Sequence, residues 1–227
     1  MKFKVGLAFS GGIDSTFAAI YLKEMGYDVV AFNFPIGRNV DNLIYDTAKK
    51  LKIKLEIIDI RKIFEQVIKE DFYKSYLTGL TPNPCVRCNR YIKFGVLYNI
   101  VKNRYHMDFL ATGHYAKIYK DENQRFFIKK AFDKDKDQSY FLWQINRLIL
   151  KDIIFPLGNI KKSEIKSILL QSGFHEIAKK VESFDICFVN EQSYKRYIEK
   201  FGVQSSNKEG YFVDQKGNIV GKHQGIY

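Results

Sequence analysis

Cysteine is scarce in this chain, with only three residues in 227. A small and odd number argues against the disulfide framework that stabilises small secreted domains. No apolar run approaches the ~18 residues that cross a membrane. The first residues, Met1 to Lys4, lead directly into a predicted strand and not into the apolar segment of a signal peptide. These absences predict a cytoplasmic protein with no membrane partner.

Acidic residues are also few, because 25 Asp and Glu stand against 37 Lys and Arg, a formal net charge of +12. Such an excess favours a polyanionic partner, since phosphates that a protein neutralises release their counterions. A lysine-rich bias of composition would give the same charge, so both explanations stay open. Hydrophobic residues make up 46% of the chain, which suffices for one large domain with or without a small appendage.

The first half of the chain alternates predicted strands and helices. This alternation predicts an α/β fold with a parallel sheet covered by helices on both faces. Ligands of such sheets bind at the carboxyl ends of the strands. We therefore expect Ser10, Phe34 and Gly113, which follow three of the strands, around one crevice. Apolar runs predict strands at 5–9, 29–34, 55–58 and 109–112, and periodicity predicts helices at 43–51, 62–76 and 89–104 and one ending at Gly26.

The pattern changes after the fourth predicted strand. A hairpin is expected at 118–128, helical structure from Gln138 to Ser172, and short β structure around a turn at 211–220. We expect three parts: an α/β domain at 1–135, a helical region at 136–205 that carries Cys187, and a short β segment at 206–227.

The segment Ser10 to Ser15, Ser-Gly-Gly-Ile-Asp-Ser, joins the first strand to the first helix. A helix start presents N–H groups that lack partners within the helix, and these groups bind anions. The glycines let the main chain approach phosphate oxygens, and both serines can add hydroxyl donors. The segment has no Walker lysine. It resembles the pyrophosphate-binding loop of the ATP pyrophosphatases, which cleave ATP to AMP and pyrophosphate while activating a carbonyl oxygen. The alternative is a glycine-rich turn without a ligand.

A Cys-x-x-Cys pair, Cys85 and Cys88, follows two closely spaced prolines that fix a rigid, non-helical approach. Cys88 is expected at or near a helix N-terminus, where the macrodipole favours the thiolate. A structural zinc site is the alternative interpretation. It would need Cys187 and a histidine as further ligands.

Six segments occur in the order seen in the bacterial tRNA 2-thiouridylases, and together they cover almost the whole chain. The sequence therefore resembles this family, which installs the 2-thio group on the wobble uridine of tRNAs for Lys, Glu and Gln. The resemblance implies an adenine nucleotide alpha hydrolase-like fold. The segments are Ser10–Ser15, Thr81–Asn89 with Ile92–Phe94, Ala111–Ala116, Lys136–Phe141, Phe155–Gly158 and Asp185–Phe188.

The resemblance also implies the ligands: ATP with Mg²⁺, tRNA, and a sulfur donor that is either a protein or inorganic sulfide. Asp14 would hold Mg²⁺ or order the loop, and Asn83 and Pro84 would contact the target base. Residues 136–205 would bind tRNA. The implied ATP-binding residues are Ala8, Phe9, Ser10, Gly11, Gly12, Ile13, Asp14, Ser15, Phe34 and Gly113, and the implied tRNA-contacting residues are Lys136, Asp137 and Gln138.

The cysteines match the family's catalytic positions with one departure. Cys88 matches the first catalytic cysteine, and Cys187 matches the cysteine that carries persulfide sulfur. Cys85 stands where most of the family has an aspartate, the proposed general base. The change gives three thiols, Cys85, Cys88 and Cys187, suited to a 4Fe–4S cluster whose fourth iron could bind hydrosulfide. A persulfide relay between Cys88 and Cys187 is the alternative.

The family continues beyond the region of His223 into a β-barrel domain, so the sequence is expected to lack that barrel. Two other functions stay open: an amide-forming ATP pyrophosphatase with structural zinc, and a tRNA-binding protein without catalysis. Some side chains also have two interpretations. Tyr140, Phe141 and Trp143 either stack on a base or pack in a core, and the pairs Lys161-Lys162 and Lys179-Lys180 either contact tRNA phosphates or face solvent.

Overall fold

A computed structural model describes residues 2–36, 40–180, 186–189, 198, 209–223 and 225. The chain divides into two compact units. Unit 1 combines residues 1–62 with 85–182, and unit 2 combines residues 63–84 with 183–227. The nucleotide-site residues expected from the sequence all belong to unit 1.

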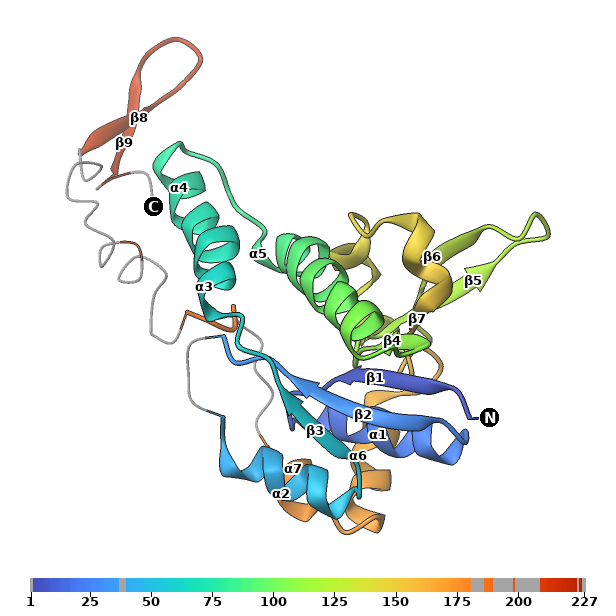
Figure 1. Cartoon of the computed structure of the whole chain (residues 1–227). Coiled ribbons are helices and arrows are strands. Elements are labelled where there is room, and N and C mark those ends of the chain that lie inside the picture. The colour runs from blue at the N-terminus through green and yellow to red at the C-terminus, as the bar shows by residue number, and fades with distance from the viewer. Residues whose placement is uncertain are drawn as a thin grey trace. The chain divides into compact units, whose positions relative to one another are not determined.

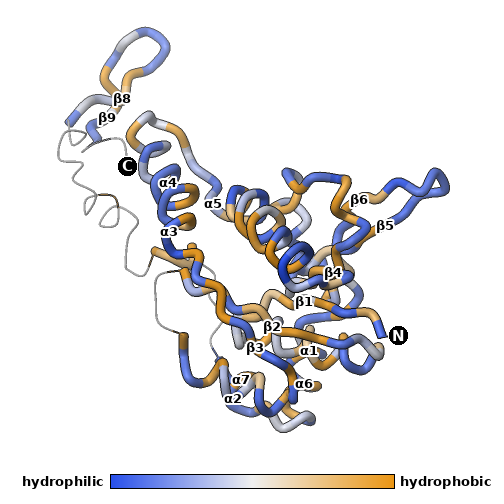
Figure 2. The backbone as a smooth tube through the Cα atoms, in the orientation of Figure 1, coloured by the Kyte–Doolittle hydropathy of each residue, from blue (hydrophilic) through white to orange (hydrophobic). Residues whose placement is uncertain are grey.

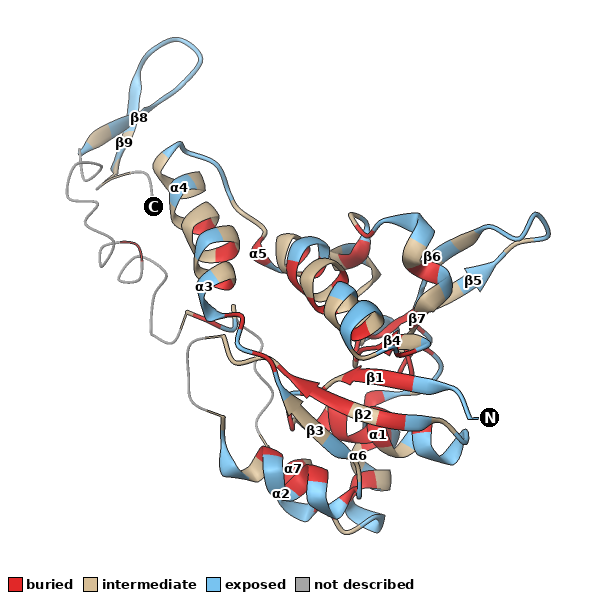
Figure 3. Ribbon diagram, viewed as in Figure 1, coloured by how far each residue is buried: buried red, intermediate tan, exposed pale blue. Residues whose placement is uncertain are grey.

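Unit 1 is built on a five-stranded sheet with the order β3-β2-β1-β4-β7, in which every neighbouring pair is parallel. Figure 3 shows β1 and β2 buried along most of their length, and Figure 2 shows that these strands are mainly hydrophobic. The predicted α/β fold with a parallel sheet is confirmed. The strands are β1 (Lys4–Ala8), β2 (Asp28–Asn33), β3 (Lys54–Ile57), β4 (Phe109–Ala111) and β7 (Ile153–Ile154).

Helices cover both faces of this sheet (Figure 1). On one face, a cluster of buried apolar side chains joins β1 and β2 to the helices α1, α2, α6 and α7. On the other face, Val101 lies so close to Gly6 that a Cβ atom at Gly6 would come within 2.5 Å of it. The helices are α1 (Ile13–Glu24), α2 (Asn42–Lys50), α6 (Lys162–Gln171) and α7 (His175–Ala178) on the first face, and α5 (Pro84–Arg87), η2 (Cys88–Leu97) and η3 (Ile100–Arg104) in the run that reaches the second.

Local signals explain where two of these helices begin and end. Asp41 caps α2, because its side chain accepts a hydrogen bond of 3.0 Å from the main-chain N–H of Leu43. Gly26 follows α1 with φ of +84°, a conformation that glycine adopts without strain. The end of α1 at Gly26 agrees with the sequence prediction.

The segment from Gln138 to Ser172 is only partly helical, which corrects the prediction. It contains the 3₁₀ turns η5 (Ser139–Leu142) and η6 (Arg147–Asp152) before β7. Residues 153 and 154 pair with β4 as a fifth strand. Residues 136–182 belong to the same compact unit as the sheet.

A two-stranded antiparallel hairpin, β5 (Ala116–Lys120) with β6 (Phe126–Lys130), also belongs to unit 1 and extends away from the sheet in Figure 1. The 3₁₀ turn η4 (Lys134–Lys136) follows it. The hairpin predicted at 118–128 is confirmed with slightly longer strands.

Unit 2 contains a helical run and a second hairpin. Its aromatic contacts involve Phe188, whose ring lies 5.7 Å from that of Phe64 and 5.3 Å from that of Phe72. Within the described part of the chain, no helix combines the length and apolarity needed to cross a bilayer. The elements are α3 (Arg61–Phe64), which begins two residues before the unit does, η1 (Glu65–Lys69), α4 (Glu70–Leu77), β8 (Gly210–Val213) and β9 (Ile219–His223).

Candidate active site

The loop from Ser10 to Ser15 joins the carboxyl end of β1 to α1, as predicted. Among the described residues, none caps the first turn of α1 with its side chain. Ser10 and Ser15 are 3.2 Å apart through their hydroxyl oxygens, and the Ser15 hydroxyl donates to the Gly12 carbonyl at 3.2 Å. The hydroxyls thus brace the loop, and the first-turn amides of α1 form the start of an anion site.

The ends of two neighbouring strands lie beside this loop. The register pairs Ala8 with Phe32, which places Ser10 and Phe34 at the same edge of the sheet. Gly113 follows β4 and packs on the loop, because a Cβ atom added to it would lie 3.2 Å from the Asp14 Cβ atom. The structure thus brings together Ser10, Phe34 and Gly113, the three strand ends expected to surround one crevice.

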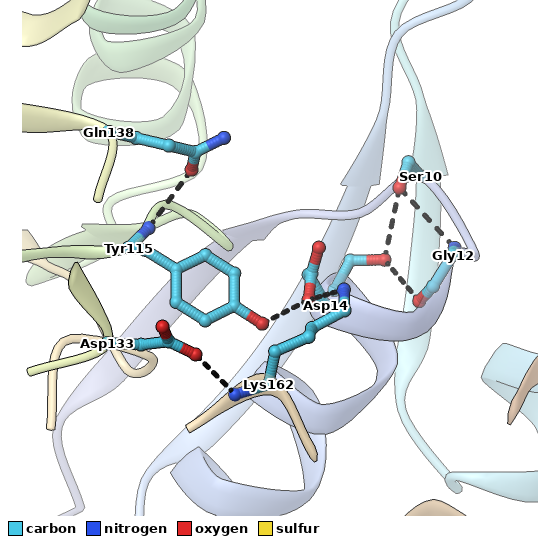
Figure 4. A network of polar contacts seen from close by, with 8 residues as sticks. Ser10, Gly12, Asp14, Tyr115, Asp133, Gln138 and Lys162 are labelled. Atoms are coloured by element: carbon cyan, nitrogen blue, oxygen red, sulfur yellow. Dashed lines mark hydrogen bonds and ion pairs between the residues drawn. The ribbon is translucent and has the colours of Figure 1, made fainter. Parts of the chain in front are cut away.

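Asp14 is the centre of a polar network that crosses unit 1 (Figure 4). Its Oδ1 atom accepts from the Lys162 ammonium at 2.6 Å and from the Tyr115 hydroxyl at 2.8 Å. The Lys162 main-chain N–H donates to Asp133 at 2.9 Å, and the Tyr115 main-chain N–H donates to the Gln138 side chain at 3.0 Å. Three segments distant from the loop in sequence, at residues 115, 133–138 and 162, are thereby joined to it.

His114 is a buried neutral side chain next to the loop. Burial holds the pKa of its imidazole well below the ordinary value, and the nearby positive charge of Lys93 lowers it further. Its Nδ1 atom lies 2.7 Å from the Thr112 hydroxyl and its Nε2 atom 3.3 Å from the Lys93 ammonium. Since an ammonium can only donate, the Nε2 atom accepts and the Nδ1 atom carries the proton. The imidazole therefore orients the Lys93 cation.

Cys85 and Cys88 lie in one helical run that begins at Pro84. Burial raises the pKa of both thiols, and the positive charge of Lys93 opposes that rise at each of them. The helical run begins four residues before Cys88, and burial raises the pKa of its thiol, so the predicted stabilisation of the thiolate by a helix start is not found.

Cys187 is exposed and belongs to the described segment 186–189 of unit 2. Among the described residues, no group of three or more His, Cys, Asp or Glu side chains could hold a metal ion. The three-cysteine ligand set therefore stays a prediction.

Two of the residues expected to contact tRNA have internal partners. Asp137 accepts from the Ala131 main-chain N–H and from the Ser139 hydroxyl, both at 2.7 Å, and Gln138 holds Tyr115. Lys136 ends η4 and Pro84 begins α5. Asp137 and Gln138 thus shape their segment from within the unit.

The comparisons with known proteins decide the family. A profile of the tRNA methyl transferase HUP domain matches residues 3–191. The tRNA-specific 2-thiouridylase MnmA of Acetivibrio thermocellus is 38% identical in a match that covers 99% of this chain and 67% of the relative. The corresponding MnmA 1 of Clostridium botulinum is 40% identical, with 99% and 65% covered. This chain belongs to the tRNA-specific 2-thiouridylase family.

The chain spans about two thirds of the length of these family members. A structure described as a 4-thiouridine synthetase–RNA complex with bound ATP is similar to 87% of this chain and 50% of its own, with a TM-score of 0.51 and 18% identity. At that identity the likeness supports the fold alone, and it agrees with the parallel sheet seen here.

Within this family site, Lys162, Tyr115 and Lys93 were not predicted from the sequence. The sequence predicts that Lys162, like Lys161, either contacts tRNA phosphates or faces solvent. Its side chain is instead only 9% exposed and paired with Asp14. The signal that could have found it is the missing lysine of the loop, since a phosphate site without its own cation needs one from elsewhere in the chain.

Proposed function

We propose that this chain carries out the ATP-dependent 2-thiolation of the wobble uridine in tRNAs for Lys, Glu and Gln. The observation that carries this proposal is the uncapped first turn of α1 with Gly113 packed against it, at the carboxyl edge of the sheet. Main-chain amides there can hold a triphosphate, with Mg²⁺ as its counterion. Membership of the family supplies the class of reaction.

The chemistry begins with a poor leaving group, the carbonyl oxygen at C2 of uridine. This oxygen attacks the α-phosphorus of ATP, the bond from that phosphorus to the bridging oxygen breaks, and pyrophosphate leaves. Donors of the loop stabilise the charge that develops on pyrophosphate. Hydrosulfide then attacks C2, the C2–O bond breaks, AMP departs with the oxygen, and the S–H proton passes to solvent. The steps need no oxidant or reductant.

A 4Fe–4S cluster is proposed from the chemistry of the donor set alone, since three thiols are the ligands that such a cluster with one free iron takes. Cys85 and Cys88 are three residues apart on one helical run, and the charge of Cys85 contributes to the raised pKa of Cys88. Cys187, exposed on unit 2, would be the third ligand. A bound cluster would offer hydrosulfide an iron without a protein ligand. Lys93 would lie beside the two thiolates and offset their charge.

Two exposed surfaces of unit 1 support an RNA partner. The β5–β6 hairpin carries exposed Lys129, whose ammonium lies 4.8 Å from the centre of the Tyr119 ring. Tyr140 and Trp143 are 68% and 67% exposed, so they do not pack in the core. Exposed rings of this kind can stack on unpaired bases, while lysines neutralise phosphates. Asn83 and Pro84 are proposed at the target base, and Lys136 at the tRNA backbone.

The function is tested by incubating the chain with ATP, Mg²⁺, tRNA and sulfide under anaerobic conditions. We expect AMP and pyrophosphate to be released only when tRNA is present, together with 2-thiouridine in the tRNA. Cys187→Ser should abolish 2-thiouridine, and full thiolation by that variant would remove Cys187 from sulfur transfer. Pyrophosphate release with a small carboxylate in place of tRNA would favour an amide-forming synthetase. Binding of tRNA with no pyrophosphate release would favour a binding protein.

The cluster is tested by iron and sulfide analysis after anaerobic purification. We expect the wild type to be brown and to contain iron and sulfide, and Cys85→Ala to be colourless. Zinc without sulfide would point to a structural metal site. An active wild type without any metal would favour the persulfide relay between Cys88 and Cys187.

A further inference from the structure

Two neighbouring segments of unit 1 contain no acidic residue. Residues 85–107 include five lysines and arginines, and residues 138–151 include two more, without one aspartate or glutamate in either segment. The first segment forms η2 and η3, and the second forms the turns η5 and η6 (Figure 1). Positive charge without acidic partners on two adjoining segments favours a polyanionic ligand.

Two hydrogen bonds join these segments directly after Cys88. The buried Asn89 side chain donates from its Nδ2 atom to the Phe141 carbonyl at 3.0 Å. At the next residue, the Arg90 guanidinium donates to the Gln144 side chain at 3.5 Å. The turn that carries Phe141 and Gln144 is therefore held against the part of η2 that follows the cysteine.

Exposed aromatic rings and guanidinium groups lie together where the two segments meet. The centre of the Tyr91 ring lies 4.8 Å from the guanidinium carbon of Arg90 and 5.1 Å from that of Arg87. Tyr140 and Trp143, on the facing turn, are 68% and 67% exposed. None of the ion pairs among the described residues involves Arg90, so its charge is available to a ligand. These five side chains are called the arginine–aromatic surface.

This combination of groups matches the chemistry of unpaired RNA. Unpaired bases stack on aromatic rings and on guanidinium planes, whereas the bases of a duplex are already stacked on one another. The phosphates between unpaired bases accept hydrogen bonds from guanidinium groups. A duplex would need the cations alone, so the exposed rings favour a single-stranded segment.

We propose that the arginine–aromatic surface binds the unpaired nucleotides beside the target uridine. The inference rests on the proposed 2-thiolation and deepens it, because a base becomes accessible at C2 only after it leaves the anticodon stack. Its neighbours then lose a stacking partner, and the rings of Tyr140 and Trp143 replace that partner. The hydrogen bonds of Asn89 and Arg90 hold these rings at a fixed place relative to Cys88.

The fluorescence of the unchanged chain gives the first test. The sequence contains one tryptophan, so the signal reports on Trp143 alone. The full chain is titrated with a stem-loop RNA that has the anticodon loop of a tRNA for Lys, and with a blunt duplex of equal length. We expect the stem-loop to quench the fluorescence to saturation, because a stacked base quenches an indole, and the duplex to leave it unchanged.

Variants give the second test, through the fluorescence anisotropy of a dye-labelled stem-loop. Trp143→Leu and Arg90→Gln should each weaken binding at least about fivefold, since one stacked base or one charge-assisted contact is lost. Trp143→Phe should recover most of the affinity. Arg104→Gln is the matched control and should bind like the wild type. Arg104 is also exposed and also lies against a tyrosine, 5.6 Å from the centre of the Tyr105 ring.

Three results would overturn the inference. The first is equal quenching by stem-loop and duplex, or no quenching at saturating stem-loop. The second is equal weakening in R90Q and R104Q, which would mean that net charge sets the affinity. The third is normal stem-loop binding by W143L and R90Q that thiolate tRNA with inorganic sulfide but not with a protein sulfur donor, since the surface would then bind that protein.

Failure of the proposed function is a separate result. If the wild type shows the quenching but tRNA causes no release of pyrophosphate from ATP, the 2-thiolation is refuted. The surface would then bind unpaired RNA in a chain without that activity. If the wild type thiolates tRNA but the stem-loop does not quench Trp143, the proposed function stands and this inference fails alone.

Discussion

Gly11 and Gly26 have the same left-handed backbone in different surroundings. Their φ angles are +69° and +84°. A Cβ atom at Gly11 would lie 2.7 Å from the Ile44 side chain, whereas one at Gly26 would have no neighbour within 4 Å among the described residues. Substitution of these two glycines therefore distinguishes backbone strain, which both share, from the steric clash with Ile44, which occurs only at Gly11.

We predict that Gly26→Ala lowers the free energy of unfolding by about 1 kcal/mol, through strain alone. Gly11→Ala should lower it by about 1–3 kcal/mol more, because Ile44 must move. Urea denaturation of the two variants measures both values. If the free energy of unfolding falls equally in both variants, Ile44 moves aside at no energetic cost and the loop is not tightly packed.

His114 should make the free energy of unfolding depend on pH. Above a pH of about 6.5, the pKa of histidine in an unfolded chain, the imidazole is neutral in the folded and unfolded states. It then does not change the free energy of unfolding with pH. Below that pH, the unfolded chain takes up a proton that buried His114 resists, since burial lowers its folded pKa. Stability should therefore fall as the pH drops from about 6.5 to 5, by up to about 1.4 kcal/mol per pH unit from this group.

The measurement is urea denaturation of the wild type and His114→Asn across that pH range. The variant should show the smaller slope. His175→Asn is the matched control, because His175 is exposed at the start of α7. A wild-type slope retained in H114N would mean that groups other than His114 cause the pH dependence.

At the scale of single residues, the sequence predicts local features but not contacts between residues that are distant in the chain. Gly11, Gly12 and Ser15 could be predicted because a strand, a small-residue turn and a helix start follow one another in sequence. Lys162 could not be assigned, because its partner Asp14 is distant in the chain and only the packing of α6 on α1 brings them together. Burial of Cys88 was hidden for the same reason, so its thiol pKa was predicted in the wrong direction.

At the scale of elements, the β5–β6 hairpin is the clearest basic feature for RNA. Lys129 and Lys130 are exposed on β6. We predict that the double change Lys129→Glu with Lys130→Glu weakens tRNA binding by at least about tenfold at moderate salt, because two phosphate contacts become repulsive. Filter binding or gel shift measures this effect.

The control makes the same charge change elsewhere in unit 1. Lys49 and Lys52 are exposed in and just after α2. Their replacement by glutamate should leave tRNA affinity nearer the wild type than the hairpin variant does. Equal losses in both variants would mean that net charge, and not the hairpin, sets the affinity.

Long elements were predictable and short ones were not. The alternation of strands and helices predicts the parallel sheet because β1, β2 and β4 each contain an apolar run with buried residues. β7 has two residues, Ile153 and Ile154, and owes its strand pairing to β4 alone. No local pattern of two isoleucines separates such a strand from the helical turns on either side.

At the scale of the whole molecule, the charge of +12 predicts a binding mode dominated by phosphates. Affinity for tRNA should fall by at least about tenfold between 50 and 200 mM salt, since neutralised phosphates release counterions. Affinity for ATP should change much less, because its proposed site is a loop of neutral amides with one partly buried ion pair. Titrations of both ligands against salt compare the slopes, and a flat slope for tRNA contradicts this prediction.

The contact between Asp14 and Lys162 also bears on how the protein is made. A ribosome releases the glycine-rich turn early and the lysine of α6 only 148 positions later. Until then Asp14 lacks this ion pair, because its ammonium partner has not yet been synthesised. The packing of α6 on α1, and with it the polar network around Asp14, can therefore form only after most of unit 1 has left the ribosome.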